Sequence, residues 1–240
     1  MNGIGIGIVN VNVNGGLREL RELRGLRGLR VLGVALALLV LVAACSRTTM
    51  PGAGDVQRPV PDLAGRTIMV MPVQQAVPTI ALPATADPAV PPALLSPSML
   101  QALEGELGYW LQERAPRTRW IEASAVEAAV ARTPMLEVNP RGLTVRDFQR
   151  ARLESIGDPL YGELRRIGTL MDARVALVPI GALWVMEQTG AGRVHLAVAL
   201  IDTVGGDVVW YGVVAGAPGD RPDAAAIAST AQALAQLVPR

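Results

Sequence analysis

Three apolar segments rich in β-branched residues follow one another toward the C-terminus, over residues 174–186, 194–202 and 207–215. Gly190-Ala191-Gly192 joins the first two segments, and Gly205-Gly206 joins the last two. Short glycine-containing links between segments of this composition are typical of β-hairpins. We therefore predict that the three segments form an antiparallel meander, around which the rest of the chain must fold.

The first two segments are apolar at both alternating positions, over residues 175–185 and 194–201. A strand with one face in water should instead alternate apolar and polar residues. Helices of the same chain could cover both faces, or one face could be open and be buried by another subunit or partner. A membrane-spanning hairpin is a third interpretation, although it would need one polar side facing a lumen. We favour coverage by the chain's own helices, because the sequence predicts five of them.

Pro179 and Gly181 lie inside the first of these segments. Because proline cannot donate a hydrogen bond to an interior ladder, this pair predicts a bulge or an edge position. An edge is a place where a partner could add a strand.

Ahead of the meander, the sequence predicts short strands at 67–73 and 119–122, with a proline-rich loop over 74–95. Helices and strands are mixed along the chain, and an antiparallel block ends it. This order predicts an α/β (α+β) fold in a single domain, with a mixed sheet, a C-terminal three-stranded antiparallel meander and helices packed on it. The predicted helices begin at Ser96-Pro97, at a capping box of Ser124 and Glu127, at Thr144 (through Leu153), at Asp158-Pro159 and at Asp220 with Pro222.

The N-terminal residues have the three parts of an export signal. Five arginines between positions 18 and 30 precede an uncharged apolar run over 31–42, and the small residues Ala43 and Ala44 then lead to Cys45. The apolar run has 12 positions, whereas a permanent membrane-spanning helix needs about 20. A cleaved signal is therefore favoured over a lasting single-pass anchor.

This pattern divides the chain into three parts. We predict a signal peptide over 1–44, a flexible Pro/Gly tether over 45–65 and a folded domain over 66–240. The signal carries a low-complexity extension at its start, which favours a true start codon downstream of Met1.

Val42-Ala43-Ala44-Cys45 resembles the lipobox of bacterial lipoproteins, in which small residues precede a lipidated cysteine. The resemblance implies cleavage between Ala44 and Cys45, a diacylglyceryl group on the thiol and acylation of the freed amine. Ser46, in place of Asp, implies transfer to the outer membrane with the domain facing the periplasm. In an organism with a single membrane, the same anchor implies the cell membrane.

Composition argues against several kinds of active site. After residue 44 the chain has 17 arginines, no lysine and 19 acidic residues, so no basic footprint for nucleic acid is present. Cys45 is the only cysteine, which excludes a disulfide or a cysteine-rich metal site within the chain. His195 is the only histidine and lies in a predicted strand, where a structural role is more common. We therefore predict no catalytic residue, no metal and no cofactor. Paired carboxylates, which can catalyse without these groups, are the remaining alternative.

Aromatic residues on the meander are the remaining candidates for recognition. Trp184, Trp210 and Tyr211 lie on the predicted strands. Large aromatic side chains anchor many interfaces, so these three are candidate partner contacts. Packing in the core explains them as well, and it is the more common role of tryptophan.

Two runs carry a second resemblance, Leu-Arg-Arg-Ile-Gly-Thr-Leu-Met-Asp-Ala-Arg-Val-Ala-Leu-Val-Pro (164–179) and Val-Ala-Leu-Ile-Asp-Thr-Val-Gly-Gly-Asp-Val-Val-Trp (198–210). With the element order, they resemble a group of periplasmic lipoprotein domains. The group includes the curli-secretion lipoprotein, activator lipoproteins of penicillin-binding proteins and the N-terminal domain of the Tol-system β-propeller protein. The likeness covers about residues 66–238 and implies a fold without shared catalytic residues. The long transmembrane insertions of the curli channel have no counterpart here.

Together these observations predict a lipid-anchored cell-envelope protein that binds, assembles or regulates a periplasmic or outer-membrane partner, or associates with itself, without enzymatic activity. A subunit of an oligomeric outer-membrane secretion assembly is one alternative. A carboxylate-dependent envelope hydrolase is another.

Overall fold

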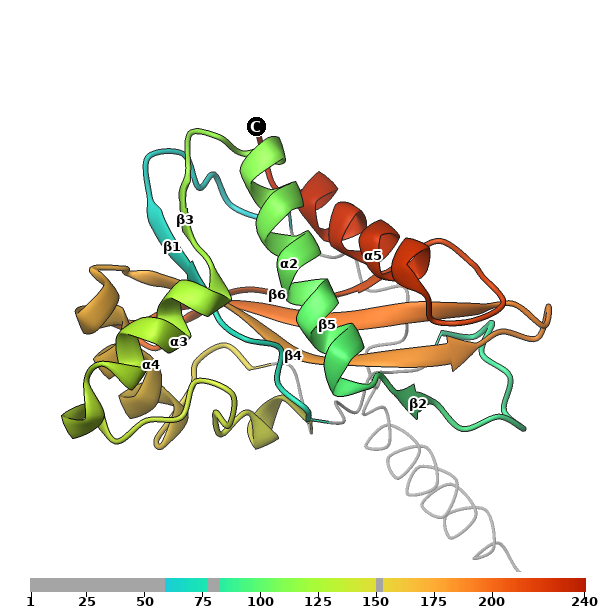
Figure 1. Cartoon of the computed structure of the whole chain (residues 1–240), viewed down its shortest axis with the longest axis horizontal. Helices are drawn as coiled ribbons and strands as arrows, with labels where there is room; N and C mark the ends of the chain where they lie inside the picture. The colour runs from blue at the N-terminus through green and yellow to red at the C-terminus, as the bar shows by residue number, and fades with distance from the viewer. Residues whose placement is uncertain (1–58, 77–82, 150–152) are drawn as a thin grey trace, which may run out of the picture. The chain divides into compact units, whose positions relative to one another are not determined.

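The computed structural model describes residues 59–76, 83–149 and 153–240 (Figure 1). The predicted signal peptide and Cys45 lie outside these ranges. The end of the predicted tether lies inside them and is folded. Val60 and Leu63 are buried in the core, and the hydroxyl of Thr118 donates a 3.0 Å hydrogen bond to the carbonyl oxygen of Leu63. The predicted domain boundary at residue 66 is therefore too late, because two apolar residues ahead of it are removed from water.

One mixed sheet has the strand order β3-β1-β4-β5-β6. β1 (Thr67–Val70) runs parallel to both β3 (Arg119–Ile121) and β4 (Val175–Met186). β5 (Gly192–Asp202) and β6 (Val208–Ala215) continue the sheet from β4 as antiparallel neighbours. Both the predicted α/β class and the predicted meander are confirmed.

The predicted loop over 74–95 contains a sixth strand, which sequence reasoning missed. β2 (Ala93–Leu94) pairs antiparallel with Leu183 and Trp184 of β4. Ala86 also forms an isolated bridge with Glu187. Neither segment is long enough to show an alternating pattern, so the pairing depends on the tertiary position of β4.

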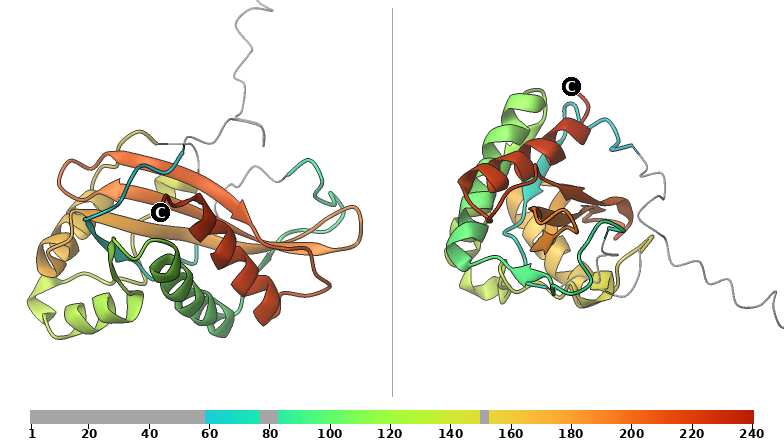
Figure 2. Two further views of the ribbon diagram at one scale, coloured as in Figure 1. Left: turned by 90° about the horizontal axis from the view of Figure 1, so that it is seen from above. Right: turned by 90° about the vertical axis from the view of Figure 1, so that its right-hand side faces the viewer.

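Four α-helices lie within the described residues, α2 (Pro97–Arg114), α3 (Ala123–Ala131), α4 (Leu160–Met171) and α5 (Ala224–Leu237). α2 and α5 lie side by side against one face of the sheet (Figure 2). α3 and α4 belong to the core on the other face. Two short 3-10 helices, Pro134–Leu136 and Arg146–Gln149, connect them. Within the described ranges, no helix combines the length and apolarity required to cross a membrane.

Each face of the sheet is covered by its own helices. We call the two resulting clusters the α2/α5 core and the α3/α4 core. Leu200 of β5 lies in the first cluster, and its neighbour Ile201 lies in the second. All positions of β4 are buried except Met186, which is half-buried. The predicted coverage by the chain's own helices is thus confirmed, and it explains why these strands lack polar alternation. The α2/α5 core includes Leu103, Leu107, Val198 and Leu234, and the α3/α4 core includes Phe148, Leu164, Ile167 and Val178.

A bulge at Pro179 and Gly181 changes the direction of the side chains along β4. The register with β5 shifts between these two residues. Val178 lies in the α3/α4 core before the shift, Ile180 lies there at the shift, and Leu183 lies there after it. The predicted bulge is confirmed, but the predicted edge position is wrong, because β4 has β1 and β2 on one side and β5 on the other.

Helix starts agree with the sequence at α2 and α4 and differ at α3 and α5. α4 begins directly after the predicted Asp158-Pro159, and Oδ1 of Asp158 accepts a 3.1 Å bond from the backbone N–H of Gly162. The Ser96 hydroxyl accepts a hydrogen bond from the backbone N–H of Met99 at 3.3 Å, as predicted for an N-cap. The predicted capping box is wrong: α3 begins after Glu122 without a side-chain cap, and Glu127 pairs with Arg141 instead. The cap of α5 is Asp223 and not Asp220.

The predicted helix from Thr144 is also absent from the described part of that segment. Only the 3-10 helix over Arg146–Gln149 forms there. The backbone N–H of Thr144 donates to Glu163 at 3.0 Å, and its hydroxyl donates to the same carboxylate at 3.3 Å. The Thr144 hydroxyl, which was predicted to cap a helix, therefore donates its hydrogen bond to Glu163 of α4 instead.

Candidate functional site

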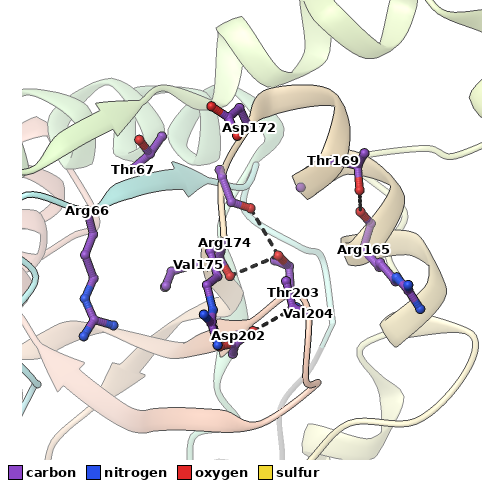
Figure 3. A pocket seen from close by; sticks show the side chains of 12 residues that line it. Arg66, Thr67, Arg165, Thr169, Asp172, Arg174, Val175, Asp202, Thr203 and Val204 are labelled. Atoms are coloured by element: carbon purple, nitrogen blue, oxygen red, sulfur yellow. Dashed lines mark hydrogen bonds and ion pairs between the residues drawn. The ribbon is translucent and has the colours of Figure 1, made fainter.

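An open pocket of about 880 Å³ lies at one edge of the sheet (Figure 3). The start of β1, the start of β4, the end of β5 and the C-terminal turns of α4 form its walls. This volume falls within the range of small-molecule sites. The pocket is lined by Arg66, Thr67, Arg165, Gly168, Thr169, Asp172, Ala173, Arg174, Val175, Asp202, Thr203 and Val204.

One wall is formed where α4 ends and the chain turns into β4. Asp172 caps the helix in the left-handed region, with φ 49°. The hydroxyl of Thr203 lies within 3.1 Å of the carbonyl oxygens of Ala173 and Arg174 and donates to them. Gly168 permits this contact, because a Cβ at that position would lie only 2.7 Å from the Thr203 hydroxyl. The last turn of α4 is therefore fixed against the end of β5.

Asp202 is a carboxylate whose oxygens are already bound. Its Oδ1 accepts hydrogen bonds from the backbone N–H groups of Val204 at 2.8 Å and Gly205 at 3.1 Å. Its Oδ2 accepts a 2.9 Å bond from Nε of Arg174. Burial alone would raise the pKa of Asp202, but these donors together hold the pKa below its ordinary value. Asp202 therefore shapes the hairpin turn and is poorly placed to accept a proton from a substrate.

The arginines of the pocket keep donors free for a ligand. Arg174 donates through Nε to Asp202, and its side chain is 74% exposed. The side chain of Arg66 makes no hydrogen bond or ion pair with another described residue. Figure 3 shows the guanidinium groups of Arg66 and Arg174 extending in the same direction, away from Asp172. Arg165 instead contacts Tyr161, whose hydroxyl lies 3.3 Å from its Nη1. Free guanidinium donors favour an anionic ligand with phosphate or carboxylate oxygens.

Sequence reasoning missed this site, although a signal for it is present. An arginine stands at or directly before the first residue of each parallel strand: Arg66 before β1, Arg119 in β3 and Arg174 before β4. Parallel strands begin at the same edge of a sheet. The three arginines could therefore have been placed together once the pairing of these strands was known.

The described residues do not bring together a metal site. No group of three or more His, Cys, Asp or Glu side chains in these ranges is arranged to hold a metal ion. Two carboxylates do converge, on Glu104 and Glu127, and Arg141 lies between them. Nη1 and Nη2 of Arg141 each donate a 3.0 Å bond to Glu104, and Nη2 donates a 2.8 Å bond to Glu127. These hydrogen bonds raise the pKa of Arg141, so the arginine stays charged between the two carboxylates.

The candidate aromatic contacts lie in or against the two cores. Trp184 and Trp210 are buried in the α2/α5 core. Tyr211 packs against the α3/α4 core and stacks on Phe148, with ring centroids 5.7 Å apart. Burial raises the pKa of the Tyr211 hydroxyl. These positions agree with the packing interpretation, and a partner contact at these residues stays a prediction. The predicted cleavage and lipidation residues, Ala44 and Cys45, lie outside the described residues.

His195 is buried in the sheet, far along β5 from the pocket. Its side chain is only 6% exposed, and its Nε2 has no hydrogen-bond partner. Burial lowers the pKa of His195, with a smaller opposing effect from Glu187 and a further lowering by Arg193. Burial therefore favours the neutral imidazole, as expected for a structural histidine.

No protein-family model matches the chain, and neither does any curated protein. Among solved structures, the chain is similar to a PelC dodecamer from Paraburkholderia phytofirmans, with 15% identity, a TM-score of 0.37, and coverage of 76% of this chain and 93% of the other. It is also similar to the L103M variant of that dodecamer, with 16% identity, a TM-score of 0.39, and coverage of 77% and 97%. At these identities and TM-scores, the likeness establishes neither a shared function nor a shared assembly for this chain.

Proposed function

We propose that the chain is an exported lipoprotein, anchored through Cys45, whose folded domain binds an envelope component without catalysing a reaction. The observation that carries this proposal is the order of the N-terminal parts. Five arginines, a charge-free apolar run and two alanines directly precede the single cysteine. Each acyl methylene buried in a bilayer contributes about 0.8 kcal/mol, so a multiply acylated cysteine anchors a protein stably. Ser46 after the cysteine supports an outer-membrane destination facing the periplasm.

The chemistry of the described residues supports binding over catalysis. The lone histidine is buried and neutral, away from the pocket. In the pocket, Asp202 is bound by Arg174 and two backbone donors. Elsewhere, Glu104 and Glu127 share Arg141. A carboxylate-dependent hydrolase would need a pair of carboxyl groups available to the substrate. Of the two that line the pocket, Asp202 is already bound, which leaves Asp172 alone.

Palmitate labelling tests the anchor. The wild-type chain should incorporate radiolabelled palmitate and lose its first 44 residues, whereas Cys45→Ala should take up no label and keep the leader. Ser46→Ala serves as the matched control and should be labelled like the wild type. Equal labelling of Cys45→Ala, or an unlabelled wild-type chain, would contradict the proposal.

A second candidate function, a subunit of a homo-oligomeric envelope assembly, is favoured by the outer strand of the sheet. β6 ends the sheet on one side and has no charged residue from Val208 to Ala215. Exposed edge strands usually carry charges or proline that prevent pairing with other chains. Light scattering should then show a particle several times the monomer mass, and Val209→Lys should reduce it to the monomer. A monomeric wild-type chain would exclude this candidate.

A further inference from the structure

Four arginines gather at the edge where the parallel strands begin. The backbone N–H of Arg119 donates to the carbonyl oxygen of Arg66 at 2.9 Å, and Gly65 donates in the same way to Arg117 at 2.9 Å. Arg66 and Arg174 line the same pocket. We call Arg66, Arg117, Arg119 and Arg174 the arginine edge, and all four side chains are exposed.

This concentration of positive charge does not follow from the composition. The described residues contain 13 arginines and 18 acidic residues, so the domain as a whole is negative. Two carboxylates, Asp172 and Asp202, line the pocket with Arg66 and Arg174. Asp202 accepts from Arg174, and Figure 3 shows the guanidinium groups of Arg66 and Arg174 extending away from Asp172. Arg66, Arg117 and Arg119 form no ion pair with a described carboxylate, so their charges remain available.

The chain reaches this edge directly from its N-terminal side. Val60 and Leu63 pack into the α2/α5 core, and Arg66 follows three residues after Leu63. Figure 1 shows β1 and β3 side by side, with the segment that leads into β1 next to them. Thirteen residues separate Cys45 from Pro59. A chain of that length reaches at most about 45 Å. An anchor at Cys45 would therefore hold the arginine edge within reach of the headgroups around it.

We infer that the arginine edge docks the domain onto anionic phospholipid headgroups of the leaflet that holds the lipid anchor. This inference rests on the proposed lipoprotein function. Guanidinium groups bind phosphate oxygens in a bidentate way, and the pocket between Arg66 and Arg174 is large enough for a headgroup. The anchor makes docking intramolecular, so contacts that are weak in solution become effective. The domain then lies on the membrane with a fixed face toward it, and the opposite end of the sheet is presented to the periplasm.

Vesicle binding by the unacylated chain tests the inference. All residues of the two cores lie between Val60 and Val238, so a chain that begins at residue 45, with Cys45→Ser, keeps the whole folded part. It should float with vesicles that contain phosphatidylglycerol, should not float with pure phosphatidylcholine, and should be released by high salt. Each arginine near an anionic surface strengthens binding about fivefold. Arg66→Gln with Arg119→Gln should therefore weaken binding on the order of 30-fold.

Arg146→Gln with Arg221→Gln is the matched control, because it removes two exposed arginines outside the arginine edge and changes the net charge equally. Thermal melting of both double variants should match the parent. Neither Arg66 nor Arg119 has a side-chain partner among the described residues, and the 3.8 Å ion pair of Arg221 with Asp223 is exposed and so contributes little to stability. Equal binding to both vesicle types, or an equal loss in the control, would overturn the inference. Displacement by inorganic phosphate beyond that by chloride of the same ionic strength would overturn it as well, in favour of a free-phosphate site. Because the chain tested carries no lipid, a negative result here leaves the palmitate experiment unaffected.

Discussion

At the scale of single residues, the buried imidazole of His195 should make stability depend on pH. The folded state lowers its pKa below the ordinary value of 6.5, so below about pH 6.5 the unfolded chain binds more protons than the folded one. Stability should therefore fall as the pH drops through that range. His195→Phe removes both the titration and the unpaired Nε2, so its urea midpoint should change less between pH 7.5 and pH 5 than that of the parent.

His195→Gln provides the control for this experiment. Glutamine does not titrate but still places polar atoms in a buried position. Its pH response should match that of His195→Phe. At pH 7.5 its free energy of unfolding should be about 1–3 kcal/mol lower than that of His195→Phe, which is the cost of an unsatisfied buried polar group. The same acid response in the parent and in His195→Phe would show that another group is responsible.

A second residue-scale prediction concerns Gly192. A Cβ at this position would overlap the indole ring of Trp184, which lies directly against the backbone. Gly192→Ala should therefore displace the ring and destabilise the fold by about 1–3 kcal/mol. At Gly105 in α2, an added Cβ would have no neighbouring atom within 4 Å, so Gly105→Ala should stabilise the fold by about 0.5–1 kcal/mol. Chemical denaturation measures the change in the free energy of unfolding for both variants. An unchanged free energy of unfolding in Gly192→Ala would contradict the close contact with Trp184.

At the scale of elements, Arg141 connects α2 with α3 through Glu104 and Glu127, and Glu104 also binds the segment that follows β1. Glu104 of α2 accepts from Arg141 and also from the backbone N–H of Val73 at 2.9 Å. The side chain of Glu104 is only 8% exposed, whereas that of Arg141 is 44% exposed. Arg141→Met leaves the carboxylate without its counter-charge. The free energy of unfolding of this variant should be about 1–3 kcal/mol lower than that of the parent. This loss is smaller than for a fully buried ion pair, because water screens the exposed side.

A double-mutant cycle isolates this contact from general effects. Glu104→Gln with Arg141→Met should lose less stability than the sum of the two single variants, because the uncompensated charge is removed. Arg146→Met changes a nearby exposed arginine and should lie within about 0.5 kcal/mol of the parent. Additive losses would show that the ion pair does not couple the elements.

At the scale of the whole molecule, the two cores share one sheet and should unfold together. All four tryptophans belong to the α2/α5 core or pack against it, so tryptophan fluorescence reports that side alone. Leu164 lies fully buried in the α3/α4 core. Leu164→Ala should cost about 2–5 kcal/mol and should shift the fluorescence and circular-dichroism transitions equally. Separate transitions would mean that the sheet does not couple its two faces.

The local pattern of the chain determined the elements whose stabilisation is mainly local. The meander follows from apolar β-rich runs and glycine links, and the start of α2 follows from Ser96 and Pro97. The two apolar faces of β4 and β5 required helices on both sides, and the chain supplies them. The bulge at Pro179 and Gly181 was predictable as well, since a proline without an N–H cannot take every place in a ladder.

Contacts between distant segments decided the rest. Glu163 accepts a hydrogen bond from the hydroxyl of Thr144, and Arg141 forms an ion pair with Glu127. These partners are not local in the sequence, so no local sequence pattern predicts the contacts. β2 exists only because β4 lies beside it. The arginine edge has the same origin: its members are spread from residue 66 to residue 174, and only the parallel pairing of β1, β3 and β4 brings them to one edge. The proposed export signal and its cysteine are linear features of the chain, so the sequence is enough to propose them, whereas a surface exists only after folding.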